Sequence, residues 1–258
     1  MKKGIIVVSF GTTHEETRRL CIESIEKRIA KEFSRFDVRR AFTSKMVINK
    51  LKSRDNLLVD TLEEALTKMK EEGFNEVYIQ SLHVTPGKEY GDIVETVRQF
   101  QDQFHKLALG RPLLTKVEDY KATVAGLKKQ LPQQKQGKAV LLMGHGTYHP
   151  ANACYSCLQS IINDEGLNAY VGTVEDYPEL QDILPKLKKA NIKEAVLMPF
   201  MLVAGDHAKN DLAGDEDSWK TVLEDDGFKV EVYMHGLGEN IEIQDIYIQH
   251  LKDAMAEQ

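Results

Sequence analysis

The sequence contains no apolar run close to the roughly 20 residues that a membrane-spanning helix requires. It has only three cysteines in 258 residues, an odd number that argues against a disulfide scaffold and suits a reducing compartment. It also lacks the patterns G-x-x-x-x-G-K-[ST], G-x-G-x-x-G and G-x-S-x-G. We therefore expect no membrane span, no bound nucleotide and no covalent catalysis.

Basic residues are fewer than acidic ones. The sequence has 34 Lys and Arg residues and 40 Asp and Glu residues, and the net charge of −6 argues against a general nucleic-acid binder. Met1-Lys2-Lys3 and the apolar residues 5–10 faintly resemble a signal peptide, but the apolar run is too short and no small-residue cleavage site follows. We expect a buried first strand there and a cytoplasmic protein.

What the sequence does contain is an alternation of short apolar runs and longer amphipathic stretches, which is typical of a parallel sheet with helices on both faces. The first half predicts strands at 5–10, 37–43 and 76–83, and helices at 16–33, 57–70 and over most of 90–107. The second half predicts strands at 139–143, 169–174, 194–202 and 229–234, and helices at 152–162, 179–189 and 241–255.

The polar, Gln-rich segment 131–137 separates these two halves and is typical of a linker. We therefore predict an α/β fold of two lobes, 1–130 and 131–258, each a parallel sheet flanked by helices. The last helix carries an apolar strip that suits either an oligomer interface or packing back onto the first lobe.

The two halves also align with one another, residues 7–12 with 142–147 and residues 79–90 with 197–208. This alignment makes Phe10 the counterpart of His145, and Glu89 the counterpart of His207. Since ligands of open α/β sheets bind at the carboxyl ends of strands, we expect an active-site cleft between the lobes that these residues line.

His145 and His207 are the leading candidates for chemistry. His145 follows a predicted buried strand between two glycines, which permit a sharp turn and close approach of a ligand. His207 follows the strand at 194–202, and Asp206 or Asp211 could accept a hydrogen bond from its second ring nitrogen. The alternative is that both are turn or loop histidines without a role.

Carboxylates follow other strands. Glu175 comes after the strand at 169–174, and two imidazoles with one carboxylate form an open site for a first-row divalent metal. Glu89 could relay protons or hold a ligand, or simply be an acid favoured at a helix N-terminus. Cys154-x-x-Cys157 could instead indicate zinc or redox chemistry, but it has no second C-x-x-C and falls on a predicted helix.

Four motifs carry a resemblance to a known family: S-F-G-T at 9–12, T-P-G-K-E-Y-G at 85–91, M-G-H-G-T at 143–147 and M-P-F-M-L-V-A-G-D-H at 198–207. Over nearly its whole length the chain resembles the anaerobic sirohydrochlorin cobaltochelatases of the class II chelatase superfamily. The resemblance implies two similar α/β lobes and ATP-independent insertion of Co²⁺ into sirohydrochlorin in anaerobic cobalamin biosynthesis. Co²⁺ is then a substrate, and we expect no permanently bound cofactor.

The resemblance also implies roles for individual residues. His145 is the catalytic histidine, His207 the second histidine, Glu175 the acidic metal ligand and Glu89 a further acidic position. Because one residue cannot easily be ligand and base at the same moment, we expect His145 to alternate between these roles or Glu89 to assist.

The implied partners are sirohydrochlorin and a divalent ion, and a homo-oligomer is left open. Phe10 could pack on the ring face, and the substrate carboxylates suit nearby basic side chains. A ferrochelatase acting on sirohydrochlorin or porphyrin, and a metal- or tetrapyrrole-binding protein without turnover, are the alternatives. The expected substrate-contacting residues are Phe10, Glu89, Lys88, Met201 and Leu202, with Arg54 and Lys209 as further basic candidates.

Overall fold

The computed structural model describes residues 2–132 and 135–256, so part of the expected linker lies outside the described residues. The chain divides into two compact units. Unit 1 comprises Met1–Thr115 with Ile243–Gln258, and unit 2 comprises Lys116–Glu242. The division therefore precedes the helix at 117–130 instead of following it, and most of the last helix groups with unit 1.

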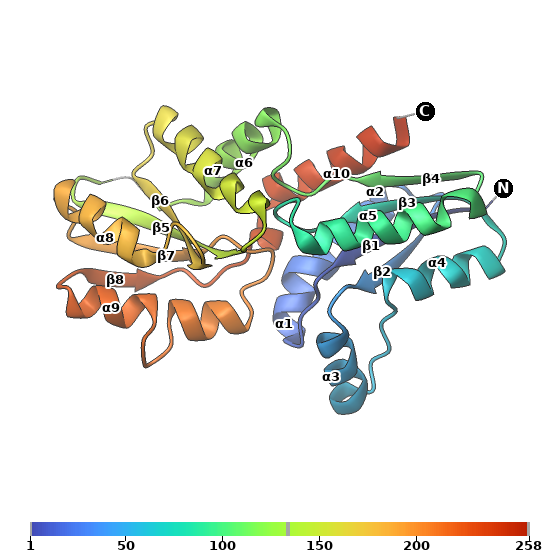
Figure 1. The fold of residues 1–258 in the computed structure, drawn as a ribbon, viewed down its shortest axis with the longest axis horizontal. Helices are drawn as coiled ribbons and strands as arrows, with labels where there is room; N and C mark the ends of the chain where they lie inside the picture. Colours follow the sequence, from blue (N-terminus) through green and yellow to red (C-terminus); the bar gives the residue numbers. More distant parts are fainter. Residues whose placement is uncertain (1, 133–134, 257–258) are drawn as a thin grey trace. The chain divides into compact units, whose positions relative to one another are not determined.

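Unit 1 is built on a parallel sheet with strand order β2-β1-β3-β4 (Figure 1). Its strands are β1 (Lys2–Ser9), β2 (Asp37–Phe42), β3 (Phe74–Ser81) and β4 (Lys106–Gly110). Its helices are α1 (Glu15–Thr17), the π-helix η1 (Arg18–Glu23), α2 (Ser24–Glu32), α3 (Lys45–Asp55), α4 (Leu62–Glu71), α5 (Lys88–Phe100), the 3₁₀ turn η2 (Gln101–Gln103) and α10 (Ile241–Ala256).

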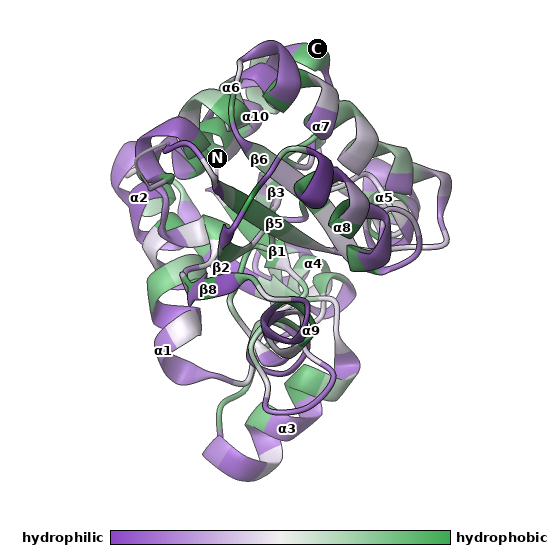
Figure 2. Ribbon diagram, turned by 90° about the vertical axis from the view of Figure 1, so that its left-hand side faces the viewer, coloured by the Kyte–Doolittle hydropathy of each residue, from purple (hydrophilic) through white to green (hydrophobic). Residues whose placement is uncertain are grey.

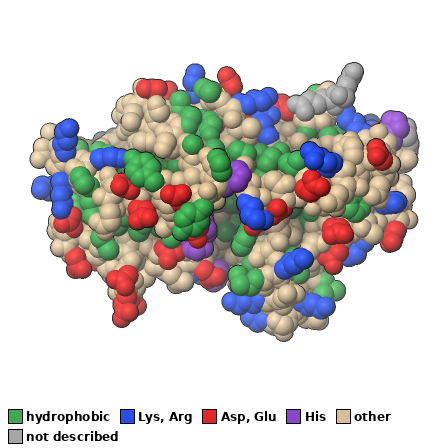
Figure 3. Space-filling model, viewed as in Figure 1, with side chains coloured by type: hydrophobic (Ala, Val, Ile, Leu, Met, Phe, Trp, Pro, Cys, Tyr) green, Lys and Arg blue, Asp and Glu red, His purple; other side chains and the backbone are tan. Residues whose placement is uncertain are grey.

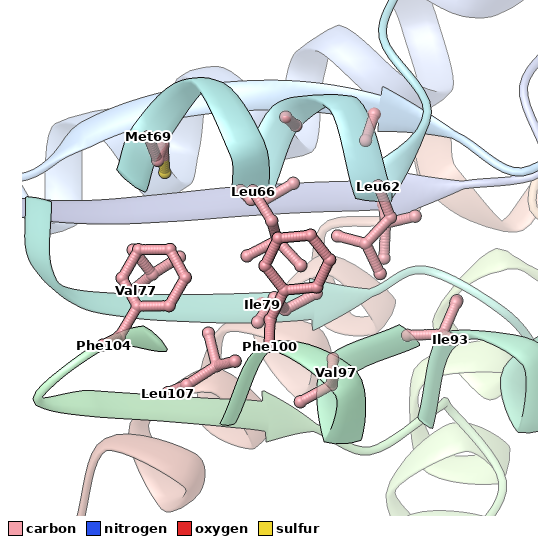
Figure 4. Packing of buried hydrophobic residues seen from close by; sticks show 14 of the residues in the cluster. Leu62, Leu66, Met69, Val77, Ile79, Ile93, Val97, Phe100, Phe104 and Leu107 are labelled. Atoms are coloured by element: carbon pink, nitrogen blue, oxygen red, sulfur yellow. The ribbon is translucent and has the colours of Figure 1, made fainter. Parts of the chain in front are cut away.

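One face of this sheet packs against α4 and α5 (Figure 4). Leu66 of α4 and Phe100 of α5 meet Ile79 of β3 there, and each such side chain contributes about 1.5–3 kcal/mol by leaving water. Helix α10 joins the same unit, since the Tyr247 hydroxyl donates to the carbonyl oxygen of Leu82 at 3.0 Å. The edge where β1 and β3 end is thereby held in place.

Unit 2 repeats the arrangement with strand order β6-β5-β7-β8, also parallel. The matching order accords with the internal alignment found in the sequence. Its strands are β5 (Lys138–Gly146), β6 (Ala169–Glu175), β7 (Glu194–Pro199) and β8 (Lys229–Val232). Its helices are α6 (Val117–Gln130), the 3₁₀ turn η3 (Pro150–Asn152), α7 (Ala153–Asp164), α8 (Leu180–Lys189), the π-helix η4 (Ala208–Leu212), α9 (Trp219–Asp225) and the 3₁₀ turn η5 (Leu237–Glu239).

Helices cover the unit 2 sheet as they cover the first. Leu187 of α8 and Trp219 of α9 pack against Leu141 and Leu197 of the central strands. In Figure 2 the central strands β1 and β5 are coloured hydrophobic, whereas the helices carry hydrophilic bands. Among the described residues, no helix combines the length and apolar character needed to cross a bilayer.

Several expected elements differ from the observed ones. The helix expected over most of 90–107 ends earlier, because α5 stops at Phe100 and the short edge strand β4 begins at Lys106. The pattern also missed α3, α6 and α9. Strand β5 extends to Gly146, so His145 lies inside the strand end rather than after it. Strand β7 stops at Pro199 and does not reach Leu202.

Candidate metal site at the sheet edge of unit 2

The end of β5 is shaped by its two glycines. A side chain at Gly144 would place its Cβ 2.3 Å from the ring of Tyr155, a helix α7 residue packed against the strand. Gly146 has φ +83° and pairs with Glu175 of β6, whose carbonyl oxygen would lie 1.7 Å from a Cβ. These close approaches fix the backbone on both sides of His145 and direct its side chain from the sheet edge.

The structure brings His145 and His207 together. Their Nε2 atoms are 3.2 Å apart, and the ring planes are inclined by 81° with centroids 4.5 Å apart. His207 immediately precedes η4, whose Asp211 lies one turn further along the chain. Two nitrogen ligands at about 2.0–2.1 Å from one tetrahedral ion would be roughly 3.3 Å apart, so the observed spacing fits joint coordination.

The hydrogen bonds of the Nδ1 atoms assign the tautomers. His145 Nδ1 lies 3.0 Å from the Gly146 carbonyl oxygen, and His207 Nδ1 lies 2.6 Å from Asp211 Oδ2. Both partners only accept hydrogen bonds, so each Nδ1 carries the proton and each neutral ring keeps a lone pair on Nε2. Two facing lone pairs at 3.2 Å repel one another unless a proton or a metal ion lies between them.

Glu175 approaches this pair from another side. Its Oε2 is 3.9 Å from His145 Nδ1, which is the imidazole nitrogen that faces away from His207. Both side chains are about 44% exposed, so the carboxylate has room to turn. Within residues 2–132 and 135–256, no three His, Cys, Asp or Glu side chains are grouped so that they could hold a metal ion. The structure thus assembles two of the three expected ligands and leaves the third beside them.

The carboxylate of Asp211 orients His207, and this contact is testable. We expect Asp211→Asn to weaken Co²⁺ binding about 10–100-fold, because an amide can present its N–H group to Nδ1 and favour the wrong tautomer. Isothermal titration with Co²⁺ measures the effect. Asp215→Asn, an exposed acid in the following loop, is the matched control. Equal affinities of the two variants would show that Asp211 does not tune the site.

The other unit 2 candidates surround the approach to His207. Met201 and Leu202 follow β7 and are half-buried, and their carbonyl oxygens accept from Leu237 and Gly238 at 2.8 and 2.9 Å. Lys209 lies in η4 and is exposed. These positions present an apolar wall and one cation on the chain segment that carries His207.

The unit 1 candidates occupy the carboxyl edge of the other sheet. Phe10 follows β1 and is 46% exposed, a large fraction for an aromatic side chain. Lys88 and Glu89 begin α5, and Lys88 is paired with Asp92 at 2.6 Å. Arg54 of α3 pairs with Asp55 at 2.6 Å, and Figure 3 shows Lys and Arg side chains gathered over this helix. Ion pairing leaves both cations less available to a substrate than a free side chain.

His83 is a residue of this edge that sequence reasoning missed. Its Nδ1 lies 3.0 Å from Ser81 Oγ, and its shielded Nε2 has no hydrogen-bond partner within the described residues. Burial lowers the pKa of His83 from 6.5 to about 4. The sequence offered only a histidine at the end of the strand predicted at 76–83, and periodicity alone does not single out such a residue; in the structure β3 ends at Ser81, two residues before His83.

This depressed pKa predicts acid sensitivity. The folded state keeps His83 neutral down to about pH 4, whereas the unfolded chain binds the proton below about 6.5. The contribution of neutral His83 to the free energy of unfolding is therefore fully present above pH 6.5. It is lost as the pH falls towards 4, and the loss is on the order of 3 kcal/mol. Urea unfolding followed by circular dichroism should show a steeper loss between pH 7 and 5 for the wild type than for His83→Gln. Equal pH dependence would contradict the buried neutral imidazole.

Residues 3–256 match the family described as cobalt chelatase (CbiK). The chain belongs to this family. A sirohydrochlorin cobaltochelatase of Salmonella typhimurium is 41% identical over 256 residues, which cover 99% of this chain and 97% of that protein. Sirohydrochlorin cobaltochelatase CbiKC of Nitratidesulfovibrio vulgaris is 36% identical, with coverages of 99% and 91%.

Solved structures support the chelatase fold. SirB from Bacillus subtilis, determined with Fe³⁺, superposes with a TM-score of 0.66 at 12% identity, covering 99% of this chain and 96% of SirB. CbiX, the terminal enzyme of siroheme biosynthesis in denitrifying bacteria, gives 0.55 at 18% identity, with coverages of 97% and 99%. At these identities the likeness concerns the arrangement of the elements. This cobalt chelatase family member therefore has the two-lobed α/β fold expected from its sequence.

Proposed function

We propose that this cobalt chelatase inserts Co²⁺ into sirohydrochlorin, without ATP, in anaerobic cobalamin biosynthesis. The observation that carries the proposal is the pair of Nε2 atoms 3.2 Å apart, each on a ring whose Nδ1 is engaged by an acceptor. The full-length relatives bear the name of this activity. A cytoplasmic location stays a prediction.

In this proposal the incoming ion is held first by the imidazoles of His145 and His207. Imidazole suits Co²⁺ and also binds Fe²⁺, Ni²⁺ and Zn²⁺, so ligand type alone does not select cobalt. Glu175 is proposed to complete the open site by turning its exposed carboxylate from its present place, 3.9 Å from His145 Nδ1, towards the Nε2 side of the ring. Two neutral imidazoles and one carboxylate form a site that can release the ion to a better ligand, as delivery to a tetrapyrrole requires.

The tetrapyrrole must lose two N–H protons as the ion enters. Once both Nε2 atoms are bound to the ion, neither accepts a proton, because each nitrogen has only one lone pair to give. His145 can act as base only before it binds the ion or after it has released it. Glu89 remains the predicted relay from unit 1, where it stands in the first turn of α5.

A metal-insertion assay tests the proposal. The absorption spectrum of sirohydrochlorin is followed with Co²⁺, Fe²⁺ or Ni²⁺ supplied one at a time, each with a protein-free control. We expect rapid protein-dependent change with Co²⁺. Change with Fe²⁺ alone would replace the cobalt assignment with iron insertion, and ring binding without acceleration by any ion would indicate a binding protein.

A further inference from the structure

A third histidine, His235, lies beyond the end of β8, at the same edge of the unit 2 sheet. Strand β8 pairs with β7 on the side opposite β5, which carries His145. Strands β5 and β8 are thus two strand spacings apart, about 10 Å. His145 at the end of β5, His207 after β7 and His235 after β8 therefore belong to the carboxyl edge of one sheet.

Hydrogen bonds tie the loop of His235 to the segment that leads into His207. The N–H groups of Leu237 and Gly238 donate to the carbonyl oxygens of Met201 and Leu202 at 2.8 and 2.9 Å. The loop that carries His235 is therefore fixed to the segment that precedes His207.

The orientation of His235 repeats that of His207. Its Nδ1 lies 2.8 Å from Oε2 of Glu239, four residues later, just as His207 lies against Asp211. The other oxygen of Glu239 accepts from the Gly236 N–H at 3.1 Å, which fixes the carboxylate. Because a carboxylate only accepts hydrogen bonds, Nδ1 carries the proton and Nε2 keeps its lone pair.

The surroundings of the ring are aromatic and apolar on one side and carry a carboxylate on the other. The Tyr233 ring lies beside it with centroids 4.5 Å apart, and Met201 and Leu202 of the adjoining loop carry no charge. The Glu239 carboxylate lies against Nδ1 at 2.8 Å, so the Nδ1–H group keeps its acceptor whichever state Nε2 is in. The side chain is 48% exposed, so a proton taken up there can pass on to water.

We propose that His235 is a proton acceptor for metal insertion; the inference rests on the proposed function. His235 Nε2 takes a pyrrole proton as the N–H bond breaks, and the electron pair of that bond becomes the nitrogen lone pair that binds Co²⁺. The imidazolium holds its Nδ1–H on Glu239 and releases the Nε2 proton to water, after which the second pyrrole proton follows the same route. A positioned base of this kind contributes about 10²–10⁴-fold to a rate.

The test compares wild type, His235→Ala and His235→Gln, with His149→Ala as a matched exposed histidine of the same unit. Cobalt insertion into sirohydrochlorin gives kcat and KM, and isothermal titration gives the Co²⁺ affinity. We expect kcat of both His235 variants to fall at least about 100-fold with KM and Co²⁺ affinity unchanged. Added imidazole should restore part of the rate of His235→Ala, an effect that a structural role would not produce.

The outcomes separate the inference from the proposed function. A wild type that inserts no metal overturns the proposed function. A wild type that turns over, together with an undiminished kcat for His235→Ala, overturns the inference alone. A raised KM with unchanged kcat, or a slow His235→Ala variant with no rescue by imidazole, also overturns it, because His235 would then act in ring binding or in structure.

Discussion

The His145→Ala variant is expected to lose cobalt insertion by more than about 100-fold while remaining folded. His145 supplies one of the two facing Nε2 atoms, and even an outer partner of a metal ligand is typically worth 10–100-fold. The side chain is 43% exposed, and it contacts Gly146, Glu175 and His207. Its removal therefore leaves the core of unit 2 intact, with a stability change within about 0.5 kcal/mol.

Three measurements on the same preparation make this prediction specific. Insertion is followed by sirohydrochlorin absorbance, Co²⁺ affinity by titration calorimetry, and ring binding by a spectral titration without metal. His105→Ala, which removes an exposed imidazole in unit 1, is the control and should behave as wild type. Insertion by His145→Ala at the wild-type rate would show that His145 has no part in the mechanism. Loss of ring binding would show that His145 binds the tetrapyrrole and not the metal ion.

The central strands were the part of the fold that sequence predicted well. Fully buried strands such as β1 and β5 are short continuous apolar runs bounded by polar residues, and burial on both faces dictates that pattern. Their shared position at the centre of two sheets with the same strand order explains why residues 7–12 align with 142–147. The two halves align because the central strand of each sheet is buried on both faces and must therefore be apolar.

Edge and surface elements escaped prediction because their patterns are weak. Strand β4 has only five residues, pairs on one side with β3, and follows directly on a helix, so its leucines continued the helical pattern. Helix α3 buries Val47 and Leu51 alone among its apolar residues, too few for a clear stripe. The boundary between the units was missed because α6 was not predicted at all.

For the candidate site, the proximity of His145 and His207 could be predicted from sequence, but the orientation of the side chains could not. Strand-end position predicted that His145 and His207 share an edge, and the structure places them 3.2 Å apart. The sequence did not distinguish Asp206 from Asp211 as the hydrogen-bond partner of His207. In the structure the helical turn of η4 brings Asp211, four residues later, against His207. The Glu175 carboxylate lies near Nδ1 of His145 because of the side-chain torsion angles of Glu175, and these cannot be read from the spacing of residues along the chain.

Gly146→Ala is expected to be the most damaging substitution of a small residue, with unit 2 destabilised by about 2–5 kcal/mol. Left-handed backbone at φ +83° costs a side chain about 1–2 kcal/mol. The added Cβ would also lie 1.7 Å from the Glu175 carbonyl oxygen and 2.9 Å from Thr173 Cβ. Because these atoms belong to the paired strand β6, relief requires the strands to separate, and overpacking adds about 1–3 kcal/mol.

The single tryptophan of the chain, Trp219, is buried in the core of unit 2 and reports its unfolding by fluorescence in urea. Gly227→Ala is the matched control, since its φ is +86° and no described atom lies within 4 Å of the added Cβ. We expect Gly227→Ala to lose only the backbone part, about 1–2 kcal/mol. An equal loss of unfolding free energy in the two variants would mean that β5 and β6 move apart at little cost to accommodate the methyl group. A larger loss at Gly146, accompanied by weaker Co²⁺ binding, would show that the tight strand pairing behind His145 also sets the position of its imidazole.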